Sequence, residues 1–361
     1  MKFIHCADLH LEAAFSAHLT REQGRERRQE LLAAFKQMVE IAAEEKVRAI
    51  LICGDLFDSN YVTKTALHLI DDLIMNHPDI DFLYLKGNHD PQDFLQSFDG
   101  SIPENLKLFS DTWTSYTYDD VVISGAELSS ENKDRIFGDL VLSQTAVNIV
   151  MLHGQLSTAK AKDKTEVIPL RDMKNRYIDY LALGHLHDYQ SGKLDTRGTW
   201  CYSGCLQGRG FDECGEKGYV LLEVEDRQVT STFVELPGRR CVEVKVDVSD
   251  TMTSPEILHR IEDTIREIPD SDLVSVVLTG EQSVDAEKNL QYLQEQISGC
   301  FYYCRIKDKT HLKISYDQYR LDKSLKGEFI RLMEQAKVKD EDRDMIIRMG
   351  LKALAGEEPF A

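Results

Sequence analysis

Five short apolar runs in the N-terminal part of the chain each end in polar side chains, usually beside a glycine. The runs have the length of β-strands, and buried strands bring their carboxyl ends together at one edge of a sheet, where ligands bind in α/β folds. We therefore expect the polar clusters to converge on one site. The runs span residues 2–6, 49–53, 81–85, 147–152 and 180–183, and the clusters that follow them are Asp8/His10, Gly54-Asp55, Gly87-Asn88-His89-Asp90, His153-Gly154 and Gly184-His185-Leu186-His187.

Together the clusters supply a donor set of the kind that holds transition-metal ions. Side chains two positions apart point the same way from an extended backbone, so Asp8 and His10 can bind as one pair and His185 and His187 as another. Mixed imidazole and oxygen donors suit manganese, iron or zinc, and contain too much nitrogen for a calcium cage. Two ions about 3.5 Å apart, bridged by one carboxylate, would use the whole set. The donors are Asp8, His10, Asp55, Asn88, His153, His185 and His187.

Each cluster by itself also has an ordinary structural explanation. A single Asp-x-His pair occurs without a metal, Asn88 and His89 could cap a turn, and His153 could be a core histidine at a strand end. The metal interpretation depends on the order of the clusters, because five independent accidents at five consecutive strand ends are improbable.

The first two-thirds of the chain alternates short strands with helical stretches. This pattern predicts a layered α/β unit or a mixed sandwich whose sheets are covered by helices. In addition to the five runs above, we expect helices over 21–45 and 64–75 and strands over 121–125, 198–205 and 218–224.

The pattern changes after Leu236, where a small α+β domain is expected to begin. Ser254 is the expected N-cap of its first helix, with Pro255 in the first turn. We expect three parts, at residues 1–236, 237–322 and 323–361. The expected elements of the last two parts are strands at 242–248, 273–279, 302–307 and 312–316 and helices at 254–267, 285–297, 325–336 and 340–354.

The composition argues against some classes of function. The 361 residues include 43 Lys and Arg against 62 Asp and Glu, a net charge of −19, which disfavours holding nucleic acid by bulk positive charge. Phosphates can still be met through bound metal ions. The apolar runs are too short to cross a bilayer and Asp8 interrupts any signal-peptide core, so we expect a cytoplasmic protein. The eight cysteines show no paired metal-binding spacing and are expected to be reduced.

The ordered clusters resemble the five motifs of the calcineurin-like metallophosphoesterases. Within that superfamily the sequence is most similar to the DNA double-strand-break repair exonuclease branch, the SbcD-type nuclease subunits, and to its shorter YhaO-type members. The resemblance covers about residues 1–236 and also includes a segment after the last motif. The residues that carry it are Asp8-Leu9-His10-Leu11-Glu12, Gly54-Asp55-Leu56-Phe57-Asp58, Gly87-Asn88-His89-Asp90, His153-Gly154, Gly184-His185-Leu186-His187, Tyr202-Ser203-Gly204, Gln207-Gly208-Arg209-Gly210-Phe211-Asp212-Glu213 and Gly215-Glu216-Lys217-Gly218.

The resemblance implies an α+β fold of four layers, a metallophosphoesterase β-sandwich flanked by helices, followed by a small α+β cap domain and C-terminal helices. It implies two divalent ions, bridged by Asp55, with His89 as the general acid near the scissile phosphate and Asp90 available to orient it. Leu9 and Asp58 depart from relatives that carry an aromatic residue and a histidine there. One ion would be held by Asp8, His10, Asp55 and His187, and the other by Asp55, Asn88, His153 and His185.

The implied activity is metal-dependent hydrolysis of phosphodiesters, with Mn²⁺ as the expected ion and Fe²⁺ or Zn²⁺ as alternatives. The implied substrate is DNA, cleaved as an exonuclease, in DNA repair; additional endonuclease activity is left open. The implied partners are an SbcC-like coiled-coil ATPase and a second copy of the chain. Arg209 is the candidate contact to a substrate phosphate, and the arginines of residues 21–28 are either a second phosphate contact or a solvated helix start.

Two other functions fit the same residues. One is a metallophosphoesterase that hydrolyses a small nucleotide or a cyclic phosphodiester, with the second domain as a lid. The other is a non-catalytic scaffold subunit, against which the complete ligand set counts. The helices expected at 325–336 and 340–354 could dock onto a coiled coil or pack on their own chain.

Overall fold

The computed structural model of the chain describes residues 1–13, 15, 19–58, 62–91, 102–157, 166–313 and 316–354. The chain divides into two compact units, Met1–Arg240 and Cys241–Ala361. The three-part division expected from the sequence stays a prediction. None of the helices within these described ranges is long and apolar enough to cross a membrane.

Two six-stranded sheets form the centre of the first unit. One sheet comprises β1 (Lys2–Cys6), β2 (Ala49–Cys53), β3 (Asp81–Leu85), β4 (Leu106–Leu108), β13 (Gly218–Glu225) and β14 (Gln228–Glu235). The other comprises β5 (Thr114–Tyr118), β6 (Val121–Gly125), β7 (Val147–His153), β10 (Tyr180–Gly184), β11 (Gln190–Lys193) and β12 (Thr199–Tyr202).

Parallel strands occupy the middle of both sheets. The first sheet has the order β14-β13-β1-β2-β3-β4, in which β1 to β4 are parallel, β13 pairs antiparallel with β1, and β14 pairs antiparallel with β13. The second has the order β11-β12-β10-β7-β6-β5, with antiparallel strands only at its two edges. Since β1, β2 and β3 are neighbours, as are β7 and β10, their carboxyl ends lie side by side.

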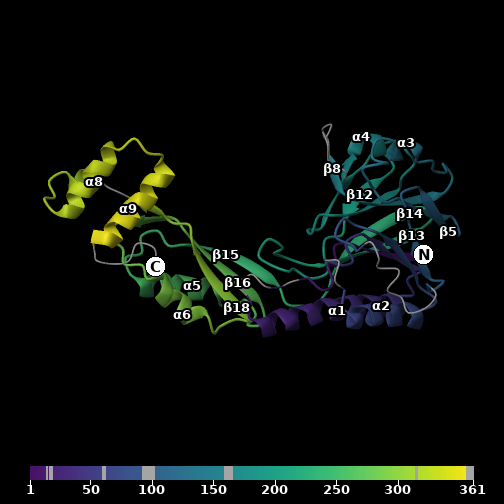
Figure 1. Ribbon diagram of the computed structural model, residues 1–361, viewed down its shortest axis with the longest axis horizontal. Helices are drawn as coiled ribbons and strands as arrows, with labels where there is room; N and C mark the ends of the chain where they lie inside the picture. The colour runs from purple at the N-terminus through teal and green to yellow at the C-terminus, as the bar shows by residue number, and fades with distance from the viewer. Residues whose placement is uncertain are drawn as a thin grey trace. The chain divides into compact units, whose positions relative to one another are not determined.

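Helices cover the outer face of each sheet, so the unit has four layers (Figure 1). The helices are α1 (Arg21–Glu44) and α2 (Lys64–Asn76) on the first sheet and α3 (Ile136–Asp139) and α4 (Leu170–Met173) on the second, where the short strands β8 (Gln155–Ser157) and β9 (Val167–Pro169) pair with each other. Three apolar clusters hold these layers together. One lies between α1, α2 and the first sheet, the second between the two sheets, and the third between the second sheet and α3 and α4. The four-layer α+β fold predicted from the resemblance is confirmed.

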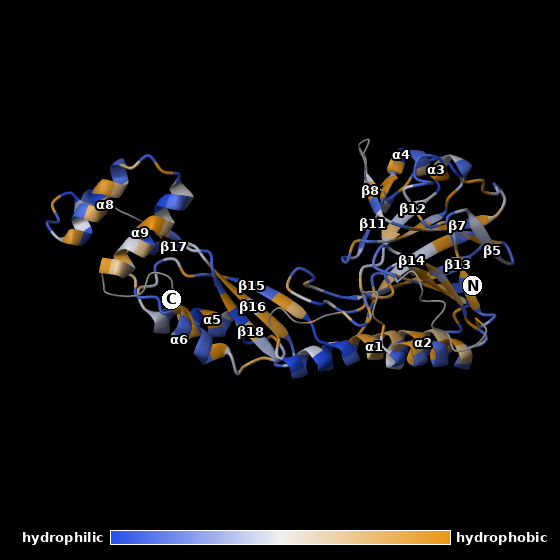
Figure 2. Ribbon diagram, in the orientation of Figure 1, coloured by the Kyte–Doolittle hydropathy of each residue, from blue (hydrophilic) through white to orange (hydrophobic). Residues whose placement is uncertain are grey.

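Burial on both faces explains why the central strands are continuous apolar runs. In β2, Ile50 and Ile52 face α1 and α2, whereas Ala49, Leu51 and Cys53 face the second sheet. The α1 helix is amphipathic instead, and its first turn is closed by a capping box between Thr20 and Gln23. Figure 2 shows hydrophobic residues along the strands of both sheets and in stripes on α1 and α2.

The second unit contains a parallel sheet of three strands in the order β15-β16-β18. One apolar cluster joins this sheet to α5 and α6. The elements of the unit are β15 (Cys241–Asp247), α5 (Ser254–Ile265), β16 (Leu273–Thr279), β17 (Glu281–Ser283), α6 (Leu290–Ile297), β18 (Tyr303–Asp308), β19 (His311–Lys313), α7 (Tyr316–Tyr319), α8 (Leu325–Gln335) and α9 (Asp340–Leu354).

Three sequence predictions for this unit were wrong in detail. Thr253, not Ser254, caps α5, because its side chain accepts the Glu256 backbone N–H in a capping box. The helix predicted at 285–297 begins only at Leu290, because the Asn289 side chain caps it there. The strand predicted at 312–316 is the shorter β19, and residues 314–315 lie outside the described residues.

Candidate metal centre

The five polar clusters meet at the carboxyl ends of β1, β2, β3, β7 and β10, where the two sheets face each other. Contacts between the sheets fix this edge. The backbone N–H of His185, after β10, donates to both carboxylate oxygens of Asp8, after β1, at 3.0 and 2.9 Å. The Nδ1 atom of His153 lies 2.9 Å from the Cys53 carbonyl at the end of β2. Polar groups from both sheets therefore line one site.

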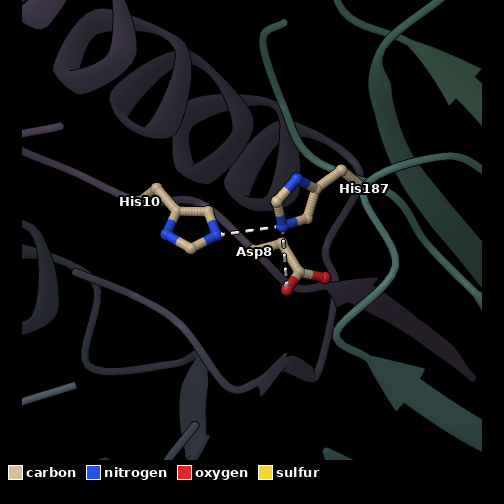
Figure 3. A group of neighbouring side chains, drawn as sticks. All are labelled: Asp8, His10 and His187. Atoms are coloured by element: carbon tan, nitrogen blue, oxygen red, sulfur yellow. Dashed lines mark hydrogen bonds and ion pairs between the residues drawn. The ribbon is translucent and has the colours of Figure 1, made fainter. Parts of the chain in front are cut away.

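Asp8, His10 and His187 form a group whose ligand atoms lie within 4.8 Å of one another (Figure 3). The Nε2 atoms of His10 and His187 are 3.2 Å apart, and Asp8 Oδ1 lies 4.0 Å from His187 Nε2. Two imidazole nitrogens bound to one ion at ordinary metal–nitrogen distances lie about 3.3 Å apart. The spacing of these two nitrogens therefore fits a shared cation.

Asp8, Asp55 and His153 form a second group beside the first. Asn88 extends it, with Oδ1 3.0 Å from His153 Nε2. One oxygen, Asp55 Oδ2, lies 3.4 Å from His153 Nε2 in this group and 3.8 Å from His10 Nε2 in the other. Asp55 thus stands between the two groups, as a carboxylate that bridges two ions must.

Burial and charge shift the pKa values of these groups in opposite directions. Burial raises the pKa of Asp8 to about 6. Burial also acts to raise the pKa of Asp55, but the hydrogen bond from His153 and other charges outweigh it and bring that pKa to about 2. The same pairing overcomes the burial of His153 and raises its pKa to about 9. A divalent cation would stabilise both buried carboxylates in their ionised form.

The backbone at several donors is held in the left-handed region that L-residues seldom adopt. The φ angles are 52° at Asp8, 44° at His10, 52° at Asp55 and 105° at His185. Such conformations cost on the order of 1 kcal/mol or more each and cluster at functional sites. Here they turn each side chain back toward the shared edge of the sheets directly after its strand ends.

Residues 1–189 match the family model of the calcineurin-like phosphoesterases, just over half of the 361 residues. The chain belongs to this family. The resemblance predicted from the motifs is therefore confirmed, and with it the enzyme class, because the family consists of metal-dependent hydrolases.

Two relatives are similar over most of this phosphoesterase. It is 27% identical over 326 residues to uncharacterized metallophosphoesterase YhaO of Bacillus subtilis (strain 168), which covers 82% of this chain and 78% of that protein. It is 28% identical over 280 residues to the D subunit of nuclease SbcCD of Staphylococcus epidermidis, covering 68% of this chain and 72% of that one. Among solved structures, TT1561 of Thermus thermophilus aligns at 13% identity and a TM-score of 0.43, covering 64% of this chain and 98% of that chain.

Two carboxylates of the phosphoesterase site were not predicted as functional residues. Asp58 Oδ1 lies 3.0 Å from His10 Nδ1, and Glu213 Oε1 lies 2.6 Å from His187 Nδ1. Both leave Nε2 of the histidine facing the site. Asp58 belongs to the second motif, and Glu213 belongs to the segment that follows the last motif. This position in the motifs was the sequence feature that could have identified them as functional residues.

The two predicted catalytic residues lie in the loop after β3. His89 is exposed, its backbone N–H donates to Asp55 Oδ1 at 2.9 Å, and its ring centroid lies 5.2 Å from that of His10. The carboxylate of Asp90 is buried and accepts the backbone N–H groups of Phe57 and Gly87, both at 2.9 Å. Asp90 therefore ties the loops after β2 and β3 together, and any effect on His89 passes through the backbone.

The candidate phosphate contacts differ in their surroundings. Arg209 lies beside the site and donates to Asp58 and Glu213, so its contact to a phosphate stays a prediction. Arg27, one of the four arginines of the α1 start, is fully buried; it donates to the Gly208 carbonyl at 2.8 Å and pairs with Glu30. The interpretation of Arg27 as a phosphate contact was therefore wrong, because the fold uses it to anchor the segment before Arg209.

Proposed function

We propose that the chain is a two-metal-dependent phosphodiesterase that acts on DNA as a nuclease subunit. The observation that carries this proposal is the position of one oxygen, Asp55 Oδ2, within 3.4 Å of His153 Nε2 and 3.8 Å of His10 Nε2. A carboxylate between two imidazole-bearing groups is the arrangement that two ions in a phosphodiesterase require. The name of the S. epidermidis relative, a subunit of nuclease SbcCD, supports a nucleic acid as the substrate class, and DNA is the proposed one.

The donor set fits two divalent ions. We propose that both are Mn²⁺, because imidazole and carboxylate ligands suit this ion. Asp8, His10, Asp55 and His187 would hold one ion, and Asp55, Asn88, His153 and His185 the other. Bound ions of this kind neutralise the phosphodiester charge and supply hydroxide near neutral pH.

The chain's own groups would orient and protonate the substrate. His89 is the proposed general acid, because it is exposed at the rim of the site while its backbone N–H is fixed by Asp55. Asp90 holds the loop that carries it. Exposure lets the imidazole reach the leaving alkoxide, and the fixed backbone limits where that alkoxide can lie.

The net charge of −19 bears on how DNA would be held. Tight autonomous binding of a polyanion needs a basic surface, which the composition does not supply. We therefore infer that DNA phosphates are engaged mainly at the metal centre and that a partner contributes further DNA contacts. The proposed setting is DNA repair in the cytoplasm.

The proposed partner is an SbcC-like coiled-coil ATPase, and the support is an apolar surface on the last two described helices. Leu325 and Leu332 lie seven positions apart on α8 and are 69% and 59% exposed, and Met345 on α9 is 60% exposed. Figure 2 shows hydrophobic residues on both helices. A heptad spacing of exposed leucines suits packing against another helix. The homodimer stays a prediction.

Incubation of the purified chain with Mn²⁺ and end-labelled DNA tests the activity. Wild type should shorten the DNA, Asp55→Asn should show no detectable shortening, and His89→Ala should be slower by about 10²–10⁴-fold, the usual contribution of a general acid. Hydrolysis of a small aryl phosphodiester without any DNA cleavage would instead favour the small-diester function. Inactivity on both substrates with Mn²⁺, Fe²⁺ and Zn²⁺ would count for the scaffold.

A further inference from the structure

A single guanidinium lies between the two carboxylates that contact metal-facing histidines. Arg209 Nη1 donates to Asp58 Oδ1 at 2.8 Å, and Nη2 donates to Glu213 Oε1 at 2.7 Å. Its Nε adds contacts to both oxygens of Glu213 at 3.1 and 3.3 Å, and its backbone N–H donates to Glu213 Oε2 at 2.7 Å. Arg209 therefore cross-links Asp58 to Glu213. Asp58 lies three residues after the proposed ligand Asp55, and Glu213 lies in the segment after β12.

Each of these carboxylates faces the Nδ1 atom of a different histidine. Asp58 pairs with His10 and Glu213 with His187, at 3.0 and 2.6 Å. At His187 the Glu213 carboxylate lies at hydrogen-bonding distance from Nδ1, which favours Nε2 as the ligand atom. At His10 the Asp58 carboxylate faces Nδ1 as an ion pair, and that nitrogen makes no hydrogen bond to any described residue. The two Nε2 atoms then lie 3.2 Å apart, at the position where one ion would be shared.

The four contacts link side chains from His10 through Asp58, Arg209 and Glu213 to His187. Arg209 Nη2 also lies 3.2 Å from His187 Nδ1 itself. Glu213 is 3% exposed, so it can adopt few other positions. The loop that carries Arg209 is anchored in turn by the buried Arg27, which donates to the Gly208 carbonyl at 2.8 Å.

The histidines of the other ion lack this support. His153 Nδ1 faces the backbone carbonyl of Cys53 at 2.9 Å, and His185 Nδ1 lies 3.8 Å from Glu166 Oε2. Neither contact involves Arg209. An effect that passes through Arg209 should therefore fall on one ion and spare the other.

We propose that Arg209 is a positioning residue that orients His10 through Asp58, and His187 through Glu213 and by its own contact to Nδ1, and so sets the affinity of the ion held by Asp8, His10, Asp55 and His187. This inference rests on the proposed two-metal function. It assigns Arg209 a role distinct from direct contact with a substrate phosphate.

Three roles for Arg209 predict different signs. Loss of a positioning residue weakens the binding of one ion, typically by 10- to 100-fold for partners one contact beyond the ligands. Loss of a positive charge that only repels metal would strengthen binding. Loss of a phosphate contact would raise KM at saturating Mn²⁺ and leave both metal affinities unchanged.

The test is a Mn²⁺ titration by isothermal calorimetry on the full chain, with no substrate present. Wild type should bind two ions. Arg209→Met should bind one of them about tenfold more weakly and the other within twofold of wild type. Arg209→Lys, which can reach only one of the two carboxylates, should bind the affected ion with an affinity between those of wild type and Arg209→Met. Arg171→Met removes an exposed arginine paired with Asp172 and serves as the matched control, with both affinities unchanged.

A double-mutant cycle shows whether Arg209 acts through Glu213. Glu213→Gln should weaken the same ion, and the double variant Arg209→Met/Glu213→Gln should be no weaker than the weaker single variant. Additive effects, a gain in affinity, or two unchanged affinities in Arg209→Met would overturn the inference and leave the proposed function standing. Fewer than two ions in wild type would overturn the proposed function, and this inference with it. Unfolding midpoints of every variant identify any that fails to fold, in which case Arg209→Lys and Glu213→Gln decide.

Discussion

At the scale of single residues, close packing makes the glycine of the third motif part of the metal centre. A Cβ added at Gly87 would lie 2.2 Å from Asp55 Oδ1 and 2.4 Å from the Asp55 backbone nitrogen. Neither atom can move freely, because Asp55 itself has a left-handed backbone and its Oδ1 accepts the His89 N–H.

Gly87→Ala should therefore displace the bridging carboxylate and weaken Mn²⁺ binding by about a hundredfold, the upper end of the effects seen when a residue that supports a metal ligand is changed. Calorimetric titration measures the Mn²⁺ affinity. Gly138→Ala is the matched control, because a Cβ there meets nothing within 4 Å. Wild-type Mn²⁺ affinity in Gly87→Ala would contradict this account of the site.

His5 gives the stability of the first unit a dependence on pH. It is completely buried, 3.0 Å from the Tyr180 hydroxyl and 3.2 Å from the Leu183 carbonyl, and burial lowers its pKa to about 3. The unfolded chain binds a proton there near pH 6.5 and the folded chain does not, so stability is lost as the pH falls below 6.5.

Between pH 7 and pH 5, His5 should remove about 2 kcal/mol from the free energy of unfolding. Urea unfolding in EDTA at the two pH values measures how much free energy of unfolding wild type and His5→Gln each lose between pH 7 and pH 5. The loss in His5→Gln should be smaller by about 2 kcal/mol. Equal losses in the two proteins would show that His5 is protonated in the folded chain.

The residues of the site differ in how far the sequence could reveal them. The seven donors could be predicted because each directly follows an apolar run, and strand ends are visible in sequence. Asp58 and Glu213 carry no such signal. Their contacts to His10 and His187 join segments that are distant in the chain and depend on where the strands place them.

At the scale of secondary-structure elements, Arg27 joins helix α1 to the segment that precedes Arg209. Its guanidinium donates to the Gly208 carbonyl, pairs with Glu30 and lies 5.5 Å over the Phe15 ring. Arg27→Leu should lower the free energy of unfolding by about 1–3 kcal/mol, because the buried Gly208 carbonyl loses its donor and the partly exposed Glu30 loses its partner.

Thermal and urea unfolding measure this loss, and Arg25→Leu, which removes an exposed arginine two positions earlier, should change stability by less than about 0.5 kcal/mol. The opposite pattern, with normal stability and weaker DNA binding in Arg27→Leu, would restore the phosphate-contact interpretation.

Elements buried on both faces were predicted closely and edge elements were not. The strands β1, β2, β3 and β16 have the predicted bounds, because continuous apolar runs mark them. Edge strands such as β11 (Gln190–Lys193) and β14 (Gln228–Glu235) contain exposed polar residues and carry little hydrophobic signal. Their positions depend on pairing with β12 and β13, which local sequence does not encode.

At the scale of the whole molecule, every proposed ligand and its supporting contacts lie within the unit Met1–Arg240. A chain ending at Arg240 should therefore bind two Mn²⁺ ions. Its rate of hydrolysis of a small aryl phosphodiester should be within about threefold of that of the full chain, because removing the second unit leaves the metal ligands and His89 in place. Calorimetry and a chromogenic assay measure both properties. Loss of either Mn²⁺ ion would mean that the unit Cys241–Ala361 supports the metal centre.

The strand order of the first sheet also bears on how the protein is synthesised. β1 lies between β2 and β13, and the amino group of Met1 donates to the carbonyl of Val224, 223 positions away. At ordinary elongation speeds the ribosome needs roughly 10–45 s to make that length of chain. Throughout this time one edge of β1 is open to other strands, a known route to aggregation. Asp8 and His10 also emerge long before His185, His187 and the Arg209 segment. The nascent chain can therefore take up its full complement of metal only when translation of this unit is nearly complete.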